Sequence, residues 1–147
     1  MTNPNQTRRF GKEDGVAIVE AAVIMLGLFV LFLGIMESGR FINAQQVLTN
    51  AAREGARFAV APLSGTDTLP SVLEVQDRVN IYLNSANLIT GSTVLVEKNV
   101  AVNHVDFTTT YTRVTVTRPY QVLTIPMFSG LEIAMEGKAT MRDETSS

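Results

Sequence analysis

The chain has 147 residues, with 12 Lys and Arg against 14 Asp and Glu, for a formal net charge of −2. This balance, with no basic cluster on one predicted face, argues against a nucleic-acid partner. The absence of cysteine excludes a disulfide framework, a thiolate metal site and a thiol nucleophile.

Residues 16–36 form an apolar run dominated by Leu, Ile, Val, Phe and Met. As a helix at about 1.5 Å per residue it would span about 31 Å, close to the hydrocarbon thickness of a bilayer. A cleaved secretory signal is the alternative, because Arg8, Arg9 and Lys12 precede the run, but such a signal has an apolar core of only about 7 to 15 residues. We therefore predict a transmembrane helix over 16–36. The preceding positive charges favour a cytoplasmic N-terminus.

One acidic residue, Glu20, lies inside this run, five residues after Gly15. Near the end of a transmembrane helix a carboxylate costs less than the about 2.5 to 3.5 kcal/mol of a charge at the bilayer centre. A carboxylate in such a place usually persists because something pairs with it or uses it. The other interpretation is a tolerated acid whose side chain reaches the membrane interface.

No helix-breaking residue stands between Gly39 and Pro62. Apolar and small residues recur there at spacings of three and four, which marks one face of a helix. They are Phe41, Ala44, Leu48, Ala51, Ala52, Gly55 and Ala59. We therefore predict that the helix continues beyond the membrane over 37–60.

The end of this helix combines small residues with charged ones. Small residues four apart let another helix approach closely. The small residues are Ala51, Ala52, Gly55 and Ala56, and the charged residues beside them are Arg53, Glu54 and Arg57. Two alternatives stay open: the face packs on the protein's own sheet below an exposed charged edge, or it bundles with other subunits.

Two stretches resemble known proteins. "GVAIVE", residues 15–20, is similar to the class III signal of type IV pilins and pseudopilins, which a prepilin peptidase cuts after the glycine. "GIMESGRFINAQQVLTNAAREGARFAV", residues 34–60, resembles the signature of the TadE-like family, pseudopilins of tight-adherence (Tad, type IVc) pilus systems. Ser38 stands where that family often has an aromatic residue.

The resemblance implies that residues 1–15 are a leader cut between Gly15 and Val16 on the cytoplasmic side. In an assembled filament, the new α-amine of a neighbouring subunit's Val16 would pair with Glu20 in a medium of low dielectric constant. Glu20 and the 51–57 block are therefore the predicted assembly residues. Prepilin peptidase, the membrane and other pilin or pseudopilin subunits are the predicted partners.

Residues 62–70, bounded by two prolines, predict a linker that ends the first helix. Ser71 and Glu74 form a capping box, Ser-x-x-Glu, which starts a second helix at about residue 71. Asn87 and Gly91 close this helix after about residue 86. Its predicted apolar stripe is Val72, Val75, Val79, Tyr82, Leu83 and Ala86.

The remainder predicts β-strands. Valines of one parity at 94–102 are interrupted by Lys98, which predicts either one long strand over 93–105 or a hairpin that turns there. A β-branched and aromatic stretch follows, with Val114 and Val116 on one face, and Pro119 suggests a sheet edge or bulge. The last strand alternates clearly, with Leu131, Ile133, Met135, Ala139 and Met141 on one face. The predicted class is α+β: a long N-terminal transmembrane helix, then a head over 61–147 with one helix and an antiparallel sheet.

We find no pattern that predicts an enzyme. His104 is the only histidine, and although Asp106 lies near it, no nucleophile elbow completes a triad. No glycine-rich loop follows a strand to hold a phosphate, and the carboxylates lack the spacing of metal ligands. We expect no cofactor and no small-molecule substrate.

The combined prediction is a single-pass protein of the cytoplasmic (inner) membrane with an extracytoplasmic head. Its expected role is that of a structural minor pseudopilin, which helps initiate or assemble a Tad-type pilus through helix packing. One rival is a membrane-anchored sensory or binding protein, which would need neither cleavage at Gly15 nor assembly. Another is a pseudopilin of a secretion filament that uses the same peptidase.

Overall fold

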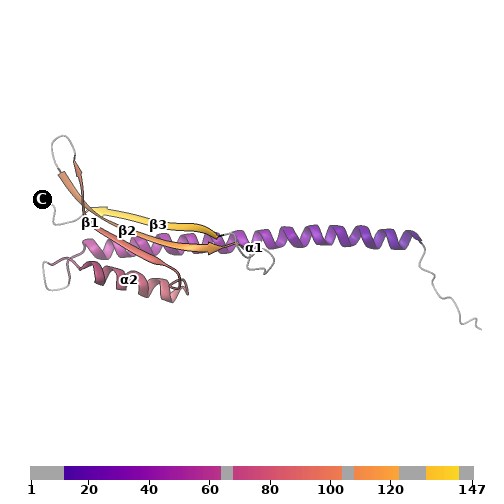
Figure 1. Ribbon diagram of the computed structural model, residues 1–147, viewed down its shortest axis with the longest axis horizontal. Helices are drawn as coiled ribbons and strands as arrows, with labels where there is room; N and C mark the ends of the chain where they lie inside the picture. The colour runs from indigo at the N-terminus through magenta and orange to yellow at the C-terminus, as the bar shows by residue number, and fades with distance from the viewer. Residues whose placement is uncertain (1–11, 64–67, 104–107, 123–131, 143–147) are drawn as a thin grey trace, which may run out of the picture. The chain divides into compact units, whose positions relative to one another are not determined.

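The computed structural model describes residues 12–63, 68–103, 108–122 and 132–142. In chain order its elements are helix α1 (Lys12–Val60), helix α2 (Val72–Ser85), and strands β1 (Thr93–Asn103), β2 (Thr108–Gln121) and β3 (Glu132–Arg142) (Figure 1). The chain divides into two compact units, Met1–Ser38 and Gly39–Ser147. The predicted α+β class, with a long N-terminal helix, one further helix and an antiparallel sheet, is confirmed.

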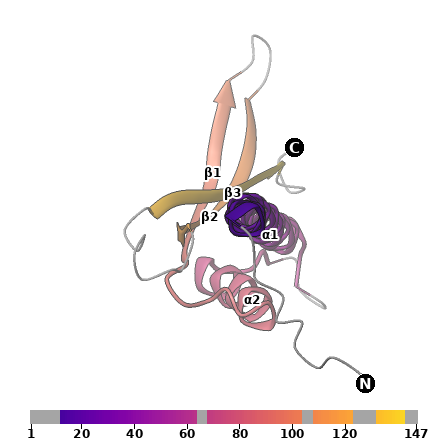
Figure 2. The same cartoon turned by 90° about the vertical axis from the view of Figure 1, so that its right-hand side faces the viewer.

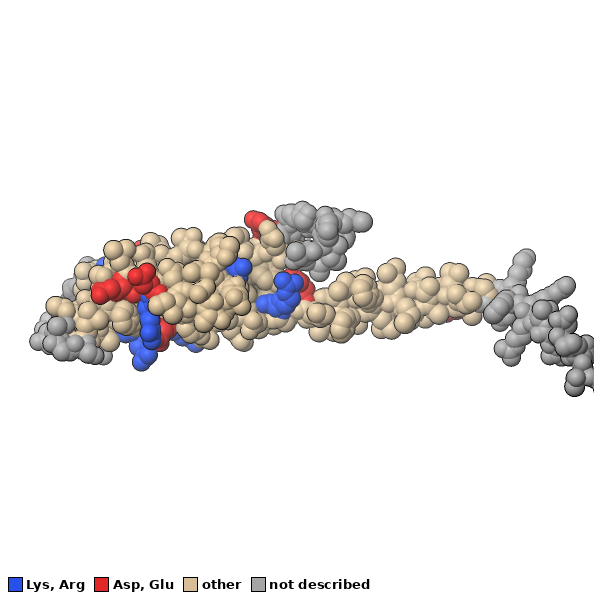
Figure 3. Space-filling model, turned by 90° about the horizontal axis from the view of Figure 1, so that it is seen from below, with Lys and Arg blue, Asp and Glu red and all other residues tan. Residues whose placement is uncertain are grey.

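The described part of the first unit is the apolar stretch of α1. Its large apolar side chains, from Val16 at 68% to Met36 at 52%, are more than half exposed, and only Leu33 is partly covered. Figure 3 shows this stretch with almost no charged atoms on the visible face. By length and composition this is the one helix, in the part of the chain that the structure describes, that could cross a membrane.

The second unit, which we call the head, packs helices against one face of a three-stranded sheet of order β1-β2-β3. Residues 39–60 of α1 and the whole of α2 lie on this face (Figures 1 and 2). The core joins all five elements, and the residues with no exposed surface include Leu48, Val75, Val79, Leu83, Val114 and Val116. The predicted apolar face of the first helix is therefore the inner wall of the head.

Helix α2 begins and ends as its sequence predicts. The Ser71 hydroxyl accepts from the Glu74 amide at 3.3 Å, and the Glu74 carboxylate accepts from the Ser71 amide at 2.7 Å, so the capping box is formed. At the other end Asn87 adopts a left-handed conformation with φ of 56°, and Leu88 then packs against the core. One member of the predicted stripe is corrected: Val72, at the first position of the helix, is 39% exposed.

Strand β1 is one continuous strand with a bulge, which settles the alternative left by Lys98. Glu97 pairs with Arg113, and Val100 pairs with Tyr111, so two residues of β1 oppose one of β2 between these pairs. One extra residue inverts the alternation of side chains. Val100 and Val102 therefore lie on the opposite face of the sheet from Val94 and Val96. The prediction that all four valines share one face is wrong, and Val102 is 40% exposed.

The two remaining strands follow the predicted pattern with one exception. β1 begins at Thr93, which pairs with Thr117, so Pro119 has a strand neighbour only on the β3 side, through Ala134. In β3, Met135 is 2% exposed and faces the core as predicted. Ile133, two residues earlier, is 42% exposed, because the helix-covered part of the sheet ends before it.

Candidate functional site

The predicted processing and pairing residues all lie on the exposed apolar stretch of α1. Gly15 has no atom within 4 Å of the position that a Cβ would take, and Val16 is 68% exposed. Glu20 is likewise exposed, one helical turn further along, with apolar side chains before and after it. The leader before residue 12 lies outside the described residues.

The small residues of the 51–57 block pack inside the head. Ala51, Ala52 and Ala56 have no exposed surface, and Gly55 is buried as well. A Cβ on Gly55 would overlap Cγ2 of Val79 and would lie 3.3 Å from Cγ1 of Val114. Of the two alternatives for this face, packing on the protein's own fold is therefore the one that the structure contains.

The charged residues of the block form an edge that joins α1 to α2. Arg53 and Arg57 are exposed, whereas Glu54 keeps only 23% of its side chain exposed. The Glu54 carboxylate accepts from Arg57 Nη2 at 3.1 Å and from Arg78 Nη2 at 3.0 Å. The Arg78 guanidinium also lies 6.0 Å from the centroid of the Phe58 ring. Glu54 thus links α1 to α2 through Arg78, a contact 24 residues away that sequence spacing could not predict.

The electrostatics of the head favour two ionised carboxylates. The hydrogen bond from Arg78 is the main cause that holds the pKa of Glu54 below its ordinary value of 4.5, although burial opposes it and Arg57 adds to it. The backbone amide of Ser71 lowers the pKa of Glu74 in the same direction, with help from the Ser71 hydroxyl. Both groups are therefore fully charged at neutral pH.

The head also has a close approach that the sequence analysis did not single out. At Gly137 of β3 a Cβ would overlap the Leu48 carbonyl group and would lie 2.6 Å from the Thr49 amide nitrogen. Next to it, Gln45 Nε2 donates to the Glu136 carbonyl at 2.7 Å. A glycine on the core parity of a strand is a weak signal of such an approach.

Among the described residues, no group of His, Cys, Asp and Glu side chains could hold a metal ion. His104 and Asp106, weighed above as part of a triad, lie outside the described residues.

Comparison with known proteins supports the resemblance seen in the sequence. No curated protein and no solved structure matches the chain. The family described as TadE-like protein matches residues 15–57, which cover the apolar stretch and the block at the end of α1. This family is related to Tad pili and is typically structural, and with the exposed apolar helix it indicates a single-pass membrane anchor. The anchor and first helix of this chain, residues 15–57, are therefore a TadE-like segment, as the sequence motifs predicted.

Proposed function

We propose that this protein is a structural minor pseudopilin, which helps initiate or assemble a Tad-type (type IVc) pilus. The observation that carries the proposal is the exposed apolar stretch over 16–36, within the TadE-like segment, with Glu20 as its only charged residue. Prepilin peptidase would cut between Gly15 and Val16. The anchor would stay in the cytoplasmic membrane with its N-terminus in the cytoplasm and the head outside.

Assembly would depend on the pairing of charges in the membrane. Glu20 sits about one turn after Val16, so the α-amine of one subunit could meet the carboxylate of the next when their anchors pack side by side. In a hydrocarbon medium such a pair attracts far more strongly than in water. The pair offsets the cost of the acid only in the assembled state, which favours association over the free subunit.

The 51–57 block would act on assembly indirectly. Ala51, Ala52, Gly55 and Ala56 are packed inside the head, so we assign them the task of positioning the charged edge. Arg53 and Arg57 are exposed at that edge and are available to a neighbouring subunit. Glu54 would hold the edge in place through Arg57 and Arg78.

Substitution of Glu20 tests the proposal. Glu20→Gln keeps the size of the side chain and removes only its charge, so membrane insertion should be unchanged. Crosslinking of the anchor to other pilin-like subunits, and the number of pili, should fall nearly as far as in Glu20→Ala. A matched control is Ala21→Gln, which adds an amide beside the intact carboxylate and should assemble normally.

The mass of the intact protein from native membranes must accompany this test. Wild type and every variant should begin at Val16, and Gly15→Leu should block the cut because a side chain would crowd the peptidase. A wild-type protein that keeps Met1 would favour the sensory or binding alternative. Normal pili from a correctly cut Glu20→Gln protein would remove Glu20 from the proposed mechanism.

A further inference from the structure

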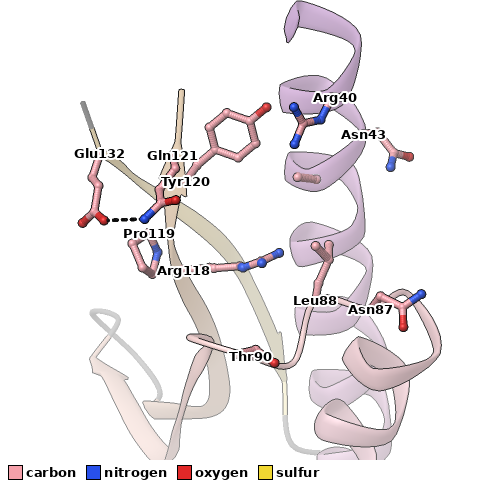
Figure 4. Close-up of a pocket in the computed structure, with 11 residues that line it drawn as sticks. Arg40, Asn43, Asn87, Leu88, Thr90, Arg118, Pro119, Tyr120, Gln121 and Glu132 are labelled. Carbon is pink, nitrogen blue, oxygen red and sulfur yellow. Dashed lines mark hydrogen bonds between the residues drawn. The ribbon is translucent and has the colours of Figure 1, made fainter. Parts of the chain in front are cut away.

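A hollow of about 550 Å³ opens on the head between residues 40–44 of α1, the loop after α2 and the end of β2 (Figure 4). This volume lies within the usual range of about 300 to 1,000 Å³ for small-molecule sites. Its polar lining includes Arg40 and Asn43 of α1, Thr90 of the loop, and Arg118 and Tyr120 of β2. None of these residues belongs to the predicted assembly set.

Arg118 is placed where a strand normally carries an apolar residue. It shares the parity of Val114 and Val116, whose side chains face the core, and it is half-buried. Figure 4 shows its side chain pointing across the hollow toward α1, where Arg40 is located. Within the described part of the chain, no carboxylate forms an ion pair with Arg118.

The one acidic residue of the lining is turned away from the Arg118 guanidinium. Glu132 lies on the opposite parity of β3 and accepts a hydrogen bond from Gln121 Nε2 at 3.1 Å. Figure 4 shows this pair at the far side of β2 from the Arg118 guanidinium. Tyr120 is held by an edge-to-face contact with Phe41, at 5.4 Å between ring centroids. The guanidinium groups of Arg118 and Arg40 thus both line the hollow, with amide and hydroxyl groups beside them.

This set of donors fits a phosphate group. A guanidinium binds phosphate oxygens through two parallel charge-assisted hydrogen bonds. Asn and Thr side chains can donate to the remaining oxygens. Two guanidinium groups that line one hollow suit an anion that carries several oxygens on one central atom.

The position of Arg40 in the chain indicates where the phosphate comes from. Arg40 follows Met36, the last residue of the apolar run, by four residues, which reach at most about 14 Å. The headgroup region adds about 5 to 8 Å on each side of the hydrocarbon core. Whatever the angle between anchor and head, Arg40 therefore stays within reach of lipid phosphates once residues 16–36 span the bilayer.

We propose that the hollow between Arg40 and Arg118 binds the phosphodiester of a membrane phospholipid in the leaflet on the head side. This inference rests on the membrane anchor of the proposed function and adds a second attachment of the head to the bilayer. Assembly of the subunit into a filament would have to exchange this lipid for other contacts.

The test follows the side-chain Nε–Hε resonances of Arg40 and Arg118 in the full chain, in maltoside micelles that contain no phosphate. Phosphatidylglycerol should shift both resonances to saturation, whereas a diacyl glycolipid without phosphate should shift neither. Arg118→Gln should raise the phosphatidylglycerol concentration that half-saturates the Arg40 shift by about tenfold or more. This is the loss expected when at least one charge-assisted hydrogen bond is removed. Arg40→Gln, on an exposed helix surface, should do the same to the Arg118 shift without disturbing the fold.

Arg53→Gln is the matched control, because it removes the same charge from an exposed position of the same helix far from the hollow. It should bind phosphatidylglycerol like the wild type. If inorganic phosphate saturates the shifts as readily as the lipid does, the hollow is a free-anion site and the lipid assignment is wrong. If the lipid moves neither resonance, the pocket proposal fails as a whole.

Flotation of the wild-type protein with vesicles separates this inference from the proposed function. A protein that floats but shows no headgroup-dependent shift retains its anchor and loses only the pocket. A protein that does not float refutes the membrane anchor, and the lipid site with it.

Discussion

At the scale of single residues, the head depends on places where a side chain would not fit. Gly55 brings α1 onto Val79 and Val114, and Gly137 brings β3 onto the backbone at Leu48. Glycine is suited to such positions because it has no Cβ, although it costs conformational entropy elsewhere. These two residues, more than any large apolar side chain, set how close the helix and the sheet lie.

Gly137→Ala should destabilise the isolated head by about 3 kcal/mol or more, because its Cβ would overlap main-chain atoms that cannot rotate away. Chemical denaturation of the 39–147 fragment measures the effect. The control is Asn50→Ala at an exposed position inside α1, which should be neutral or stabilising by up to about 1 kcal/mol. Equal stability of the two variants would show that β3 does not approach α1 at Leu48.

The ion pairs of Glu54 predict how the stability of the head depends on pH. Because the pKa of Glu54 is lowered on folding, its contribution is fully present above the ordinary value of 4.5 and is lost as the pH falls through the lowered value. The contribution should be no more than about 1 kcal/mol, since Arg57 and Arg78 are largely exposed.

Melting temperatures of wild type and Glu54→Gln, recorded between neutral pH and pH 2, check this expectation. The two curves should differ at neutral pH and converge in acid, while Glu74 contributes equally to both. A constant gap across the whole range would assign the effect of the substitution to packing.

At the scale of elements, the alternation of β3 holds only where a helix covers the sheet. Met135 and Ile133 share one parity, yet the first is 2% exposed and the second 42% exposed. Opposite Ile133, β2 carries Tyr120, which borders the open hollow. Periodicity therefore identifies the face, and the packing of the helices on the sheet decides how much of that face is buried.

These two positions give a matched pair for the register of β3. Met135→Asp should prevent folding of the head, because it places a charge without a partner in the core. Ile133→Asp, with the same charge on the same face, should cost less than about 1 kcal/mol. Circular dichroism and thermal melting of the head measure both variants. If Met135→Asp melts within a few degrees of the parent, the strand register is wrong.

At the scale of the whole molecule, the membrane anchor and the core of the head share one helix. Residues 44–60 of α1 supply about half of the buried apolar residues of the head, including Leu48 and four alanines with no exposed surface. The head begins at Gly39, well before the proline-bounded linker that the sequence predicts as its boundary. The division between anchor and head therefore lies inside α1.

Fragments that begin at different residues test this division. A 39–147 fragment should fold and unfold in one cooperative transition, since it keeps the whole core. A 62–147 fragment should lose that cooperativity, because α2 and the sheet would expose the surface that α1 covers. Thermal unfolding followed by circular dichroism distinguishes them. A sharp transition of the 62–147 fragment at a similar temperature would show that α1 is dispensable for the head.

The sequence by itself determined the elements and the family resemblance, because both depend on local patterns. The apolar run over 16–36, the capping box of Ser71 and Glu74, and the alternation around Met135 each depend on neighbours within a few residues. The order of residues 34–60 was sufficient to indicate the TadE-like resemblance, and the family model matches residues 15–57. None of these inferences needed a long-range contact.

Only the tertiary structure decided what the elements face. Spacing could not tell whether Ala51 and Gly55 meet a second subunit or the protein's own sheet, because small residues permit both, and the fold buries them against α2 and β2. Nor could it bring Arg78 to Glu54, or Arg118 to the hollow beside Arg40, across gaps of 24 and 78 residues. Such contacts depend on how strands pair and helices cross, which is a property of the folded chain and of no local segment.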